Sequence, residues 1–220
     1  TPAFTGARSI KFWSSYISPS PYTGTPALSV NGATISGATP GTAINLTFDA
    51  NAQSTFTTHF ADAGKLQLDT NYTSTAGTDS GLIMSGSSTF VVTPVGFCVQ
   101  STDTNSDCAS GDATCSAFVA AGAAFNLDII AKAWESDADT DLCTGNATTP
   151  NYVQSSIPLT HTLIAPAGVG TSSGTLGVAS VDITTGVTGS LSNPSISEGG
   201  VFTITAAPTA ASYLEGTSVP

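Results

Sequence analysis

Apolar and polar residues alternate with a period of two along most of the chain, in short segments separated by Gly, Pro and Asn. Successive side chains of a strand point to opposite faces of a sheet, so this alternation predicts strands that bury one face. Helical periodicity is nearly absent, and the segments recur at the short spacing of an antiparallel sandwich. We predict strands at 10–17, 27–30, 44–48, 55–60, 65–68 and 90–92, and a second series at 125–133, 159–164, 181–183 and 201–204.

A short internal repeat indicates more than one domain. The pattern acidic-x-Gly-x-apolar-x-apolar occurs at 62–68 and again at 198–204, and an alternating strand (44–47 or 181–184) precedes each copy at nearly the same distance. The pattern resembles the corner before strand F of immunoglobulin-like domains, where the acidic residue and Gly shape a turn and the apolar residues enter the core. The Cys that follows this corner in antibody domains is missing.

The repeat and the strand spacing together predict an all-β chain of two tandem immunoglobulin-like antiparallel β-sandwich domains. We expect the first domain at residues 1–94 and the second at 95–220, joined near Pro94. The second domain then contains every cysteine of the chain.

Composition and charge exclude several classes of function. Charged residues make up 9% of the chain, and 35 Thr and 29 Ser supply the neutral polar positions instead. The formal net charge is −11 and no basic run is present, so we expect neither nucleic acid nor anionic membrane surfaces as partners. The apolar runs are far shorter than the ~20 residues that span a bilayer, so membrane insertion is not expected in this segment. A hydrophobic content of 40% is sufficient for a folded core.

The four cysteines, Cys98, Cys108, Cys115 and Cys143, are an even set without a Cys-x-x-Cys pair. A zinc site would need close-spaced pairs or nearby His, and both His lie outside the cluster. We therefore predict two disulfides and an oxidising compartment. Among the three connectivities we favour Cys98–Cys108 with Cys115–Cys143, because each bond then closes one polar loop.

The densest chemical feature is an acidic loop, and further acids lie in the neighbouring Cys-bounded loop at Asp103, Asp107 and Asp112. Carboxylates at this density are candidate Ca²⁺ ligands, although the EF-hand pattern fails because Leu142 replaces its Gly and Thr148 its final Glu. A solvated turn is the favoured interpretation, and an irregular calcium site is the alternative. No other cofactor is expected. The candidate ligands are Glu135, Asp137, Asp139 and Asp141.

Catalytic signals are weak, and we expect no enzyme. His59 and His161 lie in predicted strands, where packing explains them, and no Gly-x-Ser-x-Gly elbow occurs. Lys132 is the best-placed lysine for an internal isopeptide crosslink with Asn or Asp, which we do not favour. A flat row of exposed aromatics would indicate a carbohydrate-binding module. The candidates are Trp13, Tyr16, Tyr22, Tyr72, Trp134 and Tyr152.

The chain resembles the C-terminal region of the mannose-sensitive haemagglutinin pilus biogenesis proteins of the MshQ type. This resemblance implies an exported bacterial surface protein that is linked to type IV pili and attachment, and it implies no catalytic residues. It covers nearly the whole chain and rests mostly on turn and core motifs. These motifs are at 10–16, 62–68, 86–94, 121–125, 149–152, 159–161, 165–166, 174–177 and 198–200.

We therefore expect a segment of a large extracellular, pilus-associated protein of the cell surface that acts as a structural or adhesive module. Its partners would be neighbouring domains or subunits of the same assembly, and a glycan or a host or abiotic surface beyond them. The alternatives are a building block of an extracellular filament, in which a donated strand completes a neighbour's sheet, and a carbohydrate-binding β-sandwich.

Overall fold

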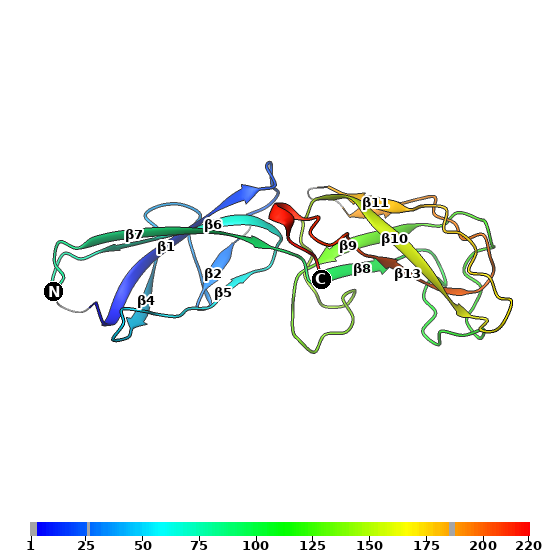
Figure 1. Cartoon of the computed structure of the whole chain (residues 1–220), viewed down its shortest axis with the longest axis horizontal. Coiled ribbons are helices and arrows are strands. Elements are labelled where there is room, and N and C mark those ends of the chain that lie inside the picture. Colours follow the sequence, from blue (N-terminus) through cyan, green and yellow to red (C-terminus); the bar gives the residue numbers. More distant parts are fainter. Residues whose placement is uncertain (1–3, 26, 185–187) are drawn as a thin grey trace. The chain divides into compact units, whose positions relative to one another are not determined.

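The computed structural model describes residues 4–25, 27–184 and 188–220. Strands form nearly all of its regular structure, and η1, a short 3-10 turn at Leu214–Gly216, lies near the C-terminus (Figure 1). The chain divides into two compact units, residues 1–92 (unit 1) and residues 93–220 (unit 2). Among the described residues, no helix is long and apolar enough to cross a membrane.

Unit 1 consists of two antiparallel sheets. One sheet has the order β4-β1-β6-β7 and the other has the order β3-β2-β5. The long strands β1, β6 and β7 belong to the first sheet, and the strands of the second sheet have only two or three residues. The bounds are β1 Gly6–Ser18, β2 Leu28–Val30, β3 Ala33–Thr34, β4 Thr42–Phe48, β5 Thr58–Phe60, β6 Gly64–Thr73 and β7 Ile83–Val92.

The core of unit 1 contains the alternating apolar residues of both sheets. In β1, Ile10 and Phe12 are buried while Ser9 and Lys11 are exposed, as the period-two pattern predicts. Aromatic rings extend this core at its margin, where Phe4 packs edge-on against other rings. The buried cluster consists of Ile10, Phe12, Leu28, Val30, Ile35, Ile44, Leu46, Leu68 and Tyr72.

Unit 2 is also built from two sheets, with the strand orders β12-β9-β8 and β11-β10-β13. Its buried residues include the alternating apolar positions of β9 and β10 and the fully buried Tyr152, whose ring packs against Tyr213 near η1. Burial raises the pKa of Tyr152 above its ordinary value, and the neighbouring Tyr213 adds to the effect. The bounds are β8 Gly96–Gln100, β9 Leu127–Lys132, β10 Gln154–Ala165, β11 Ser180–Ile183, β12 Gly189–Leu191 and β13 Val201–Ala206.

The internal repeat of the sequence is a repeat of topology. The arrangement β4-β1-β6 in unit 1 corresponds to β11-β10-β13 in unit 2. In both units the first long strand ends in a register shift opposite the start of the strand that follows the repeated Gly. A Cβ at Gly64 would lie 2.0 Å from the Tyr16 hydroxyl, and one at Gly200 would lie 2.5 Å from Leu163 Cδ1. The corner therefore requires Gly because the neighbouring strand approaches closely.

The prediction of an all-β chain with two tandem domains is confirmed. All ten predicted strand segments overlap observed strands. Three strands were not predicted, namely β3, β8 and β12, and β7 is far longer than the predicted segment at 90–92. The omission of β8 matters most, because this strand carries Cys98.

Candidate functional site: the disulfide-closed loops of unit 2

The Cys98–Cys143 bond, which we call the outer disulfide, fastens a long loop to the core of unit 2. Cys98 lies at the centre of β8, opposite Ile130 of β9, and only 1% of its surface is exposed. The chain leaves β9, turns through the acidic loop and returns to bond with Cys98, with the two Cα atoms 4.8 Å apart. Leu142 covers the start of β8 so closely that a Cβ on Gly96 would lie 2.7 Å from its Cδ1.

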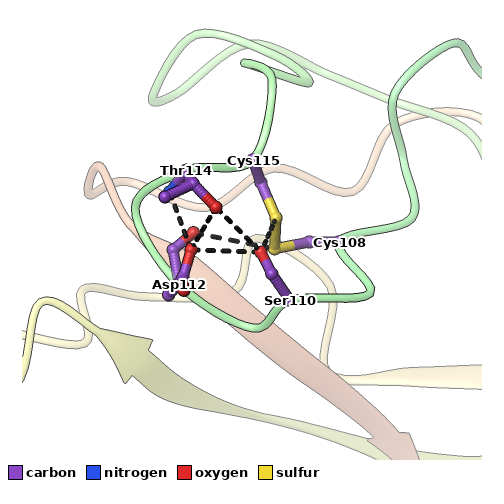
Figure 2. Close-up of a disulfide and its surroundings, with 5 residues drawn as sticks. All are labelled: Cys108, Ser110, Asp112, Thr114 and Cys115. Carbon is purple, nitrogen blue, oxygen red and sulfur yellow. Dashed lines mark hydrogen bonds between the residues drawn. A yellow bond between two sulfur atoms is a disulfide. The ribbon is translucent and has the colours of Figure 1, made fainter.

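The Cys108–Cys115 bond, which we call the inner disulfide, closes a short loop within the chain segment that the outer disulfide encloses. Figure 2 shows that the side chain of Asp112 points into this loop, toward Ser110 and Thr114. Its Oδ1 accepts hydrogen bonds from Thr114 N (2.8 Å), Thr114 Oγ1 (2.6 Å) and Ser110 Oγ (3.1 Å). The side chain of Asp112 therefore adds to the two backbone hydrogen bonds within this loop, Gly111 N to Cys108 O and Cys115 N to Asp112 O.

The predicted pairing of Cys98 with Cys108 and of Cys115 with Cys143 is wrong. That prediction included no strand at Cys98, whereas Cys98 lies in strand β8 and is buried. Pairing of β8 with β9 brings the residues after β9, not those after β8, next to Cys98. Cys108 and Cys115 remain together in the connection between the two strands and close their own loop.

Hydrogen bonds to carboxylates also anchor the connection between β8 and β9. Asp103 accepts hydrogen bonds from both Asn126 N and Asn126 Nδ2, each at 2.8 Å. The bond from the Asn126 backbone N–H has the larger effect and the side-chain bond adds to it, and together they hold the pKa of the Asp103 carboxyl below its ordinary value. The hydroxyl and backbone N–H of Thr114 lower the pKa of Asp112 in the same way, with a further contribution from Ser110. At neutral pH, ionised carboxylates therefore accept the hydrogen bonds that hold the β8–β9 connection at Asp103 and the loop of the inner disulfide at Asp112.

The candidate calcium ligands lie in the loop that the outer disulfide secures, but three of their four carboxylates accept hydrogen bonds from within that loop. Asp139 Oδ1 accepts from Asp141 N (2.9 Å), Asp141 Oδ1 accepts from Cys143 N (3.0 Å), and Asp137 Oδ1 accepts from Trp134 Nε1 (3.0 Å). The side chain of Glu135 lies against Gly145. Within the described ranges, no group of three or more His, Cys, Asp or Glu is placed to hold a metal ion. Calcium binding stays a prediction without geometric support.

A buried lysine closes the base of the acidic loop. Lys132 is 8% exposed, and its Nζ donates to the backbone oxygen of Asn146 at 3.1 Å. Asn146 is buried as well and donates from Nδ2 to Ala133 O. These bonds join the end of β9 to the returning chain, where Lys132 also pairs with Thr148 in an isolated bridge. The lysine therefore acts together with the outer disulfide to hold the loop.

The other candidate residues are divided between the two units. His59 is exposed in β5, whereas His161 contacts Ser173 O and packs against Phe202. Two of the six aromatic candidates are exposed, Tyr22 in unit 1 and Trp134 in unit 2. The remaining four are half-buried or buried. Tyr22 packs against Tyr16, and Trp134 Nε1 donates to Asp137 Oδ1, so each exposed aromatic contacts a neighbour within its own unit.

The disulfide connectivity was predicted incorrectly from the sequence, and the Asp112 turn was not predicted. The spacing Ser110-x-Asp112-x-Thr114 between two cysteines is a signal for the turn, since Ser, Asp and Thr side chains commonly bond to backbone two residues away. The pairing had no comparable local signal because it depends on which strands are neighbours.

Comparison with known protein families gave one match in each unit. Residues 1–87 match the family described as "Domain of unknown function (DUF6701), first Ig-like domain". Residues 93–194 match the family described as "DUF6701, second domain". No curated protein and no solved structure gave a significant match.

Proposed function

Because the chain carries two tandem DUF6701 domains, we propose that it is a non-catalytic structural module of a large bacterial surface protein. The resemblance to MshQ-type proteins supports an exported, pilus-associated setting. The observation that carries the proposal is the nested pair of disulfides in unit 2, which hold long loops that have little regular structure. Such bonds persist in oxidising compartments, outside the cytoplasm of most bacteria.

The position of the outer disulfide protects part of unit 2 from mechanical extension. It links β8, close to the start of unit 2, to a residue 45 positions later. A force applied to the ends of the chain cannot extend the enclosed segment while that bond is intact. Unit 2 can therefore lose its folded structure under tension and still keep the enclosed segment closed.

The surface chemistry supports a spacer or contact module rather than an ionic binder. Ser and Thr supply 64 of the 220 residues, and Lys and Arg supply only four. Hydroxyl groups keep the outer faces of the sheets hydrated without attracting charged ligands, in agreement with the low charged fraction. The module would contact neighbouring domains or subunits of the same assembly.

Protease accessibility on intact cells tests the proposed location. The full-length protein, with an epitope tag inserted after Gly170 in an exposed loop of unit 2, is expressed in its native host. We expect proteinase K to remove the tag from intact cells while a cytoplasmic marker survives. Survival of the tag in intact cells, with its loss after lysis, would contradict a surface location.

A deletion experiment tests the structural role separately. Full-length protein that lacks residues 1–220 is compared with a variant in which only the inner disulfide is removed. We expect the deletion to reduce attachment or pilus assembly while the remaining protein still reaches the surface. Unchanged attachment and pilus number after the deletion would contradict the proposed role, even if the protein is exported.

A further inference from the structure

Strand β7 forms one open edge of the main sheet of unit 1. It pairs with β6 along its whole length, from Gly64 opposite Val92 to Thr73 opposite Ile83, without a register shift. Among the residues that the structure describes, the sheet order places no strand on its other side. Residues 83–89 are all exposed, and Ile83 is exposed to 69%. Unit 1 therefore presents a straight, unpaired strand edge to its surroundings.

The backbone groups on the open side of β7 can be assigned from its contacts with β6. Three carbonyls at even-numbered positions, in or next to β7, accept hydrogen bonds from β6 or the residue after it. They are Leu82 O from Ser74 N (3.0 Å), Met84 O from Asn71 Nδ2 (3.3 Å) and Gly86 O from Thr70 Oγ1 (3.3 Å). Strand residues alternate in direction, so the odd-numbered residues from Ile83 to Val91 direct N–H and C=O outward.

This edge lacks the features that usually prevent edge-to-edge pairing. Proteins commonly protect an edge strand with a charged residue, a Pro, a bulge or a very short length. The sequence of β7 is IMSGSSTFVV, which contains neither a charge nor a Pro, and its ten-residue ladder has no bulge. The outward N–H and C=O groups of β7 can therefore pair with another strand.

The sequence of β7 is complementary to itself. Residues 83–91 consist of two large apolar residues, five small residues and two further large apolar residues. An antiparallel pair of β7 strands centred on Ser87 would place Ile83 opposite Val91 of the other copy, and Met84 opposite Phe90. Apolar cross-strand pairs of this kind stabilise a sheet. In the same register, each odd-numbered residue of one copy lies opposite an odd-numbered residue of the other. The outward N–H and C=O groups of the two strands therefore face each other and can form hydrogen bonds.

The charge distribution also favours a second copy as the occupant. Unit 1 carries four acidic and three basic residues, whereas unit 2 carries eleven acidic residues and the single basic residue Lys132. Nearly all of the net charge of −11 thus belongs to unit 2. Unit 1, which carries β7, has a net charge of only −1, so pairing of two copies of unit 1 brings little like charge together.

We propose that β7 of one copy pairs antiparallel with β7 of a second copy about a two-fold axis at Ser87. The two four-stranded sheets then form one continuous sheet of eight strands. The contact is isologous, so it closes a dimer and leaves no β7 edge free. This interface does not depend on the proposed cellular role, because it follows from unit 1 alone.

Sedimentation equilibrium of the whole chain tests the association, at concentrations up to about 1 mM. We expect a concentration-dependent dimer. Ser87→Lys places two like charges opposite each other within the interface, at the axis, and should lower the association constant at least about tenfold. Asn45→Lys, at an exposed position of the opposite edge strand β4, is the matched control and should leave it unchanged. Thermal melting of both variants checks that they fold.

Cysteine crosslinking tests the register. The described cysteines are all in disulfides, so a new thiol is chemically distinct. Ser87→Cys should form a covalent dimer under mild oxidation, because paired residues at the axis have Cα atoms about 5.5 Å apart. Thr89→Cys is the control, since the two copies of residue 89 would be about 14 Å apart in this register.

Three outcomes overturn the proposal. One is a monomer over the whole concentration range together with Ser87→Cys crosslinking no greater than that of Thr89→Cys. A second is a dimer that Asn45→Lys weakens and Ser87→Lys does not, which would assign the interface to β4. Association with a different protein, with no self-association, would likewise contradict the second copy as occupant.

Discussion

Removal of the outer disulfide should destabilise unit 2 more than removal of the inner disulfide. A disulfide restricts the unfolded chain, and the effect grows with the length of the loop that it closes. The outer bond closes a separation of 45 residues and the inner bond a separation of 7. The loop-closure relation then assigns about 4 kcal/mol to the outer bond and about 2.4 kcal/mol to the inner bond.

Burial increases this difference. Cys98 is almost completely buried, whereas Cys108 and Cys115 are half-buried. Truncation to Ala leaves a space in the core only at Cys98, which adds a packing loss to the loss of the crosslink. Cys98→Ala/Cys143→Ala should therefore be the more destabilised double variant, and Cys108→Ala/Cys115→Ala is its matched control.

Urea unfolding monitored by tryptophan fluorescence measures both variants. Trp13 lies in unit 1 and Trp134 in unit 2, so a Trp13→Phe background reports on unit 2 alone. With a urea m-value of about 2 kcal/mol/M, we expect the midpoint to fall by about 2 M for the outer variant and about 1 M for the inner one. The m-value of the outer variant should also rise, because its unfolded chain is less compact.

Equal losses of stability in the two variants, or a larger loss in the inner variant, would refute this reasoning. Peptide mapping without reduction checks the connectivity on which it rests. Asp-N protease places each cysteine in a separate peptide, and we expect 79–102 linked to 141–181 and 107–111 linked to 112–127. A link between 79–102 and 107–111 would contradict the structure directly.

Three further predictions concern the same elements. Thr114→Val should raise the pKa of Asp112 toward its ordinary value of 3.8, as measured by carboxyl ¹³C NMR, and an unchanged pKa would contradict the role of Thr114. Because the pKa of Asp112 is lower in the folded state, its contribution to stability is present above pH 3.8 and is lost as pH falls through the folded pKa. Gly200→Ala should destabilise unit 2 by about 1–3 kcal/mol in urea, whereas Gly199→Ala, which has nothing within 4 Å, should change stability little, and equal effects would argue against the close corner. In force spectroscopy, reduction of the outer disulfide should lengthen the unfolded unit 2 by about 150 Å, because the intact bond keeps 45 residues at about 3.3 Å each from being stretched. No change in length would show that the bond is absent.

Strand positions could be predicted where the residues themselves carry the inward and outward pattern. In β1 and β4 most inward positions are large and apolar, so alternation alone identifies the buried face. Strand β8 was missed because its buried positions are Gly96 and Cys98, while Phe97 and Val99 are only half-buried. The usual contrast between faces is reversed there, and the pattern does not identify a strand.

The length of β7 and the disulfide pairing could not be predicted for a different reason. Residues 83–89 contain mostly Ser and Gly and have no buried face, so their extended structure depends on the ten-residue ladder with β6. The partner of Cys98 is likewise set by the neighbouring strand β9. Features that depend on a partner distant in sequence leave little signal in the local pattern.

The repeated topology has a consequence for folding during synthesis. Because β4-β1-β6 and β11-β10-β13 are equivalent, strands of one unit are plausible partners for strands of the other, and tandem domains are prone to such misassembly. At about 5–20 residues per second, unit 2 emerges over roughly 6–26 s, whereas β-sandwiches fold in milliseconds to seconds. Unit 1 can thus complete its sheets before the competing strands exist, and the order of translation keeps the two similar halves apart.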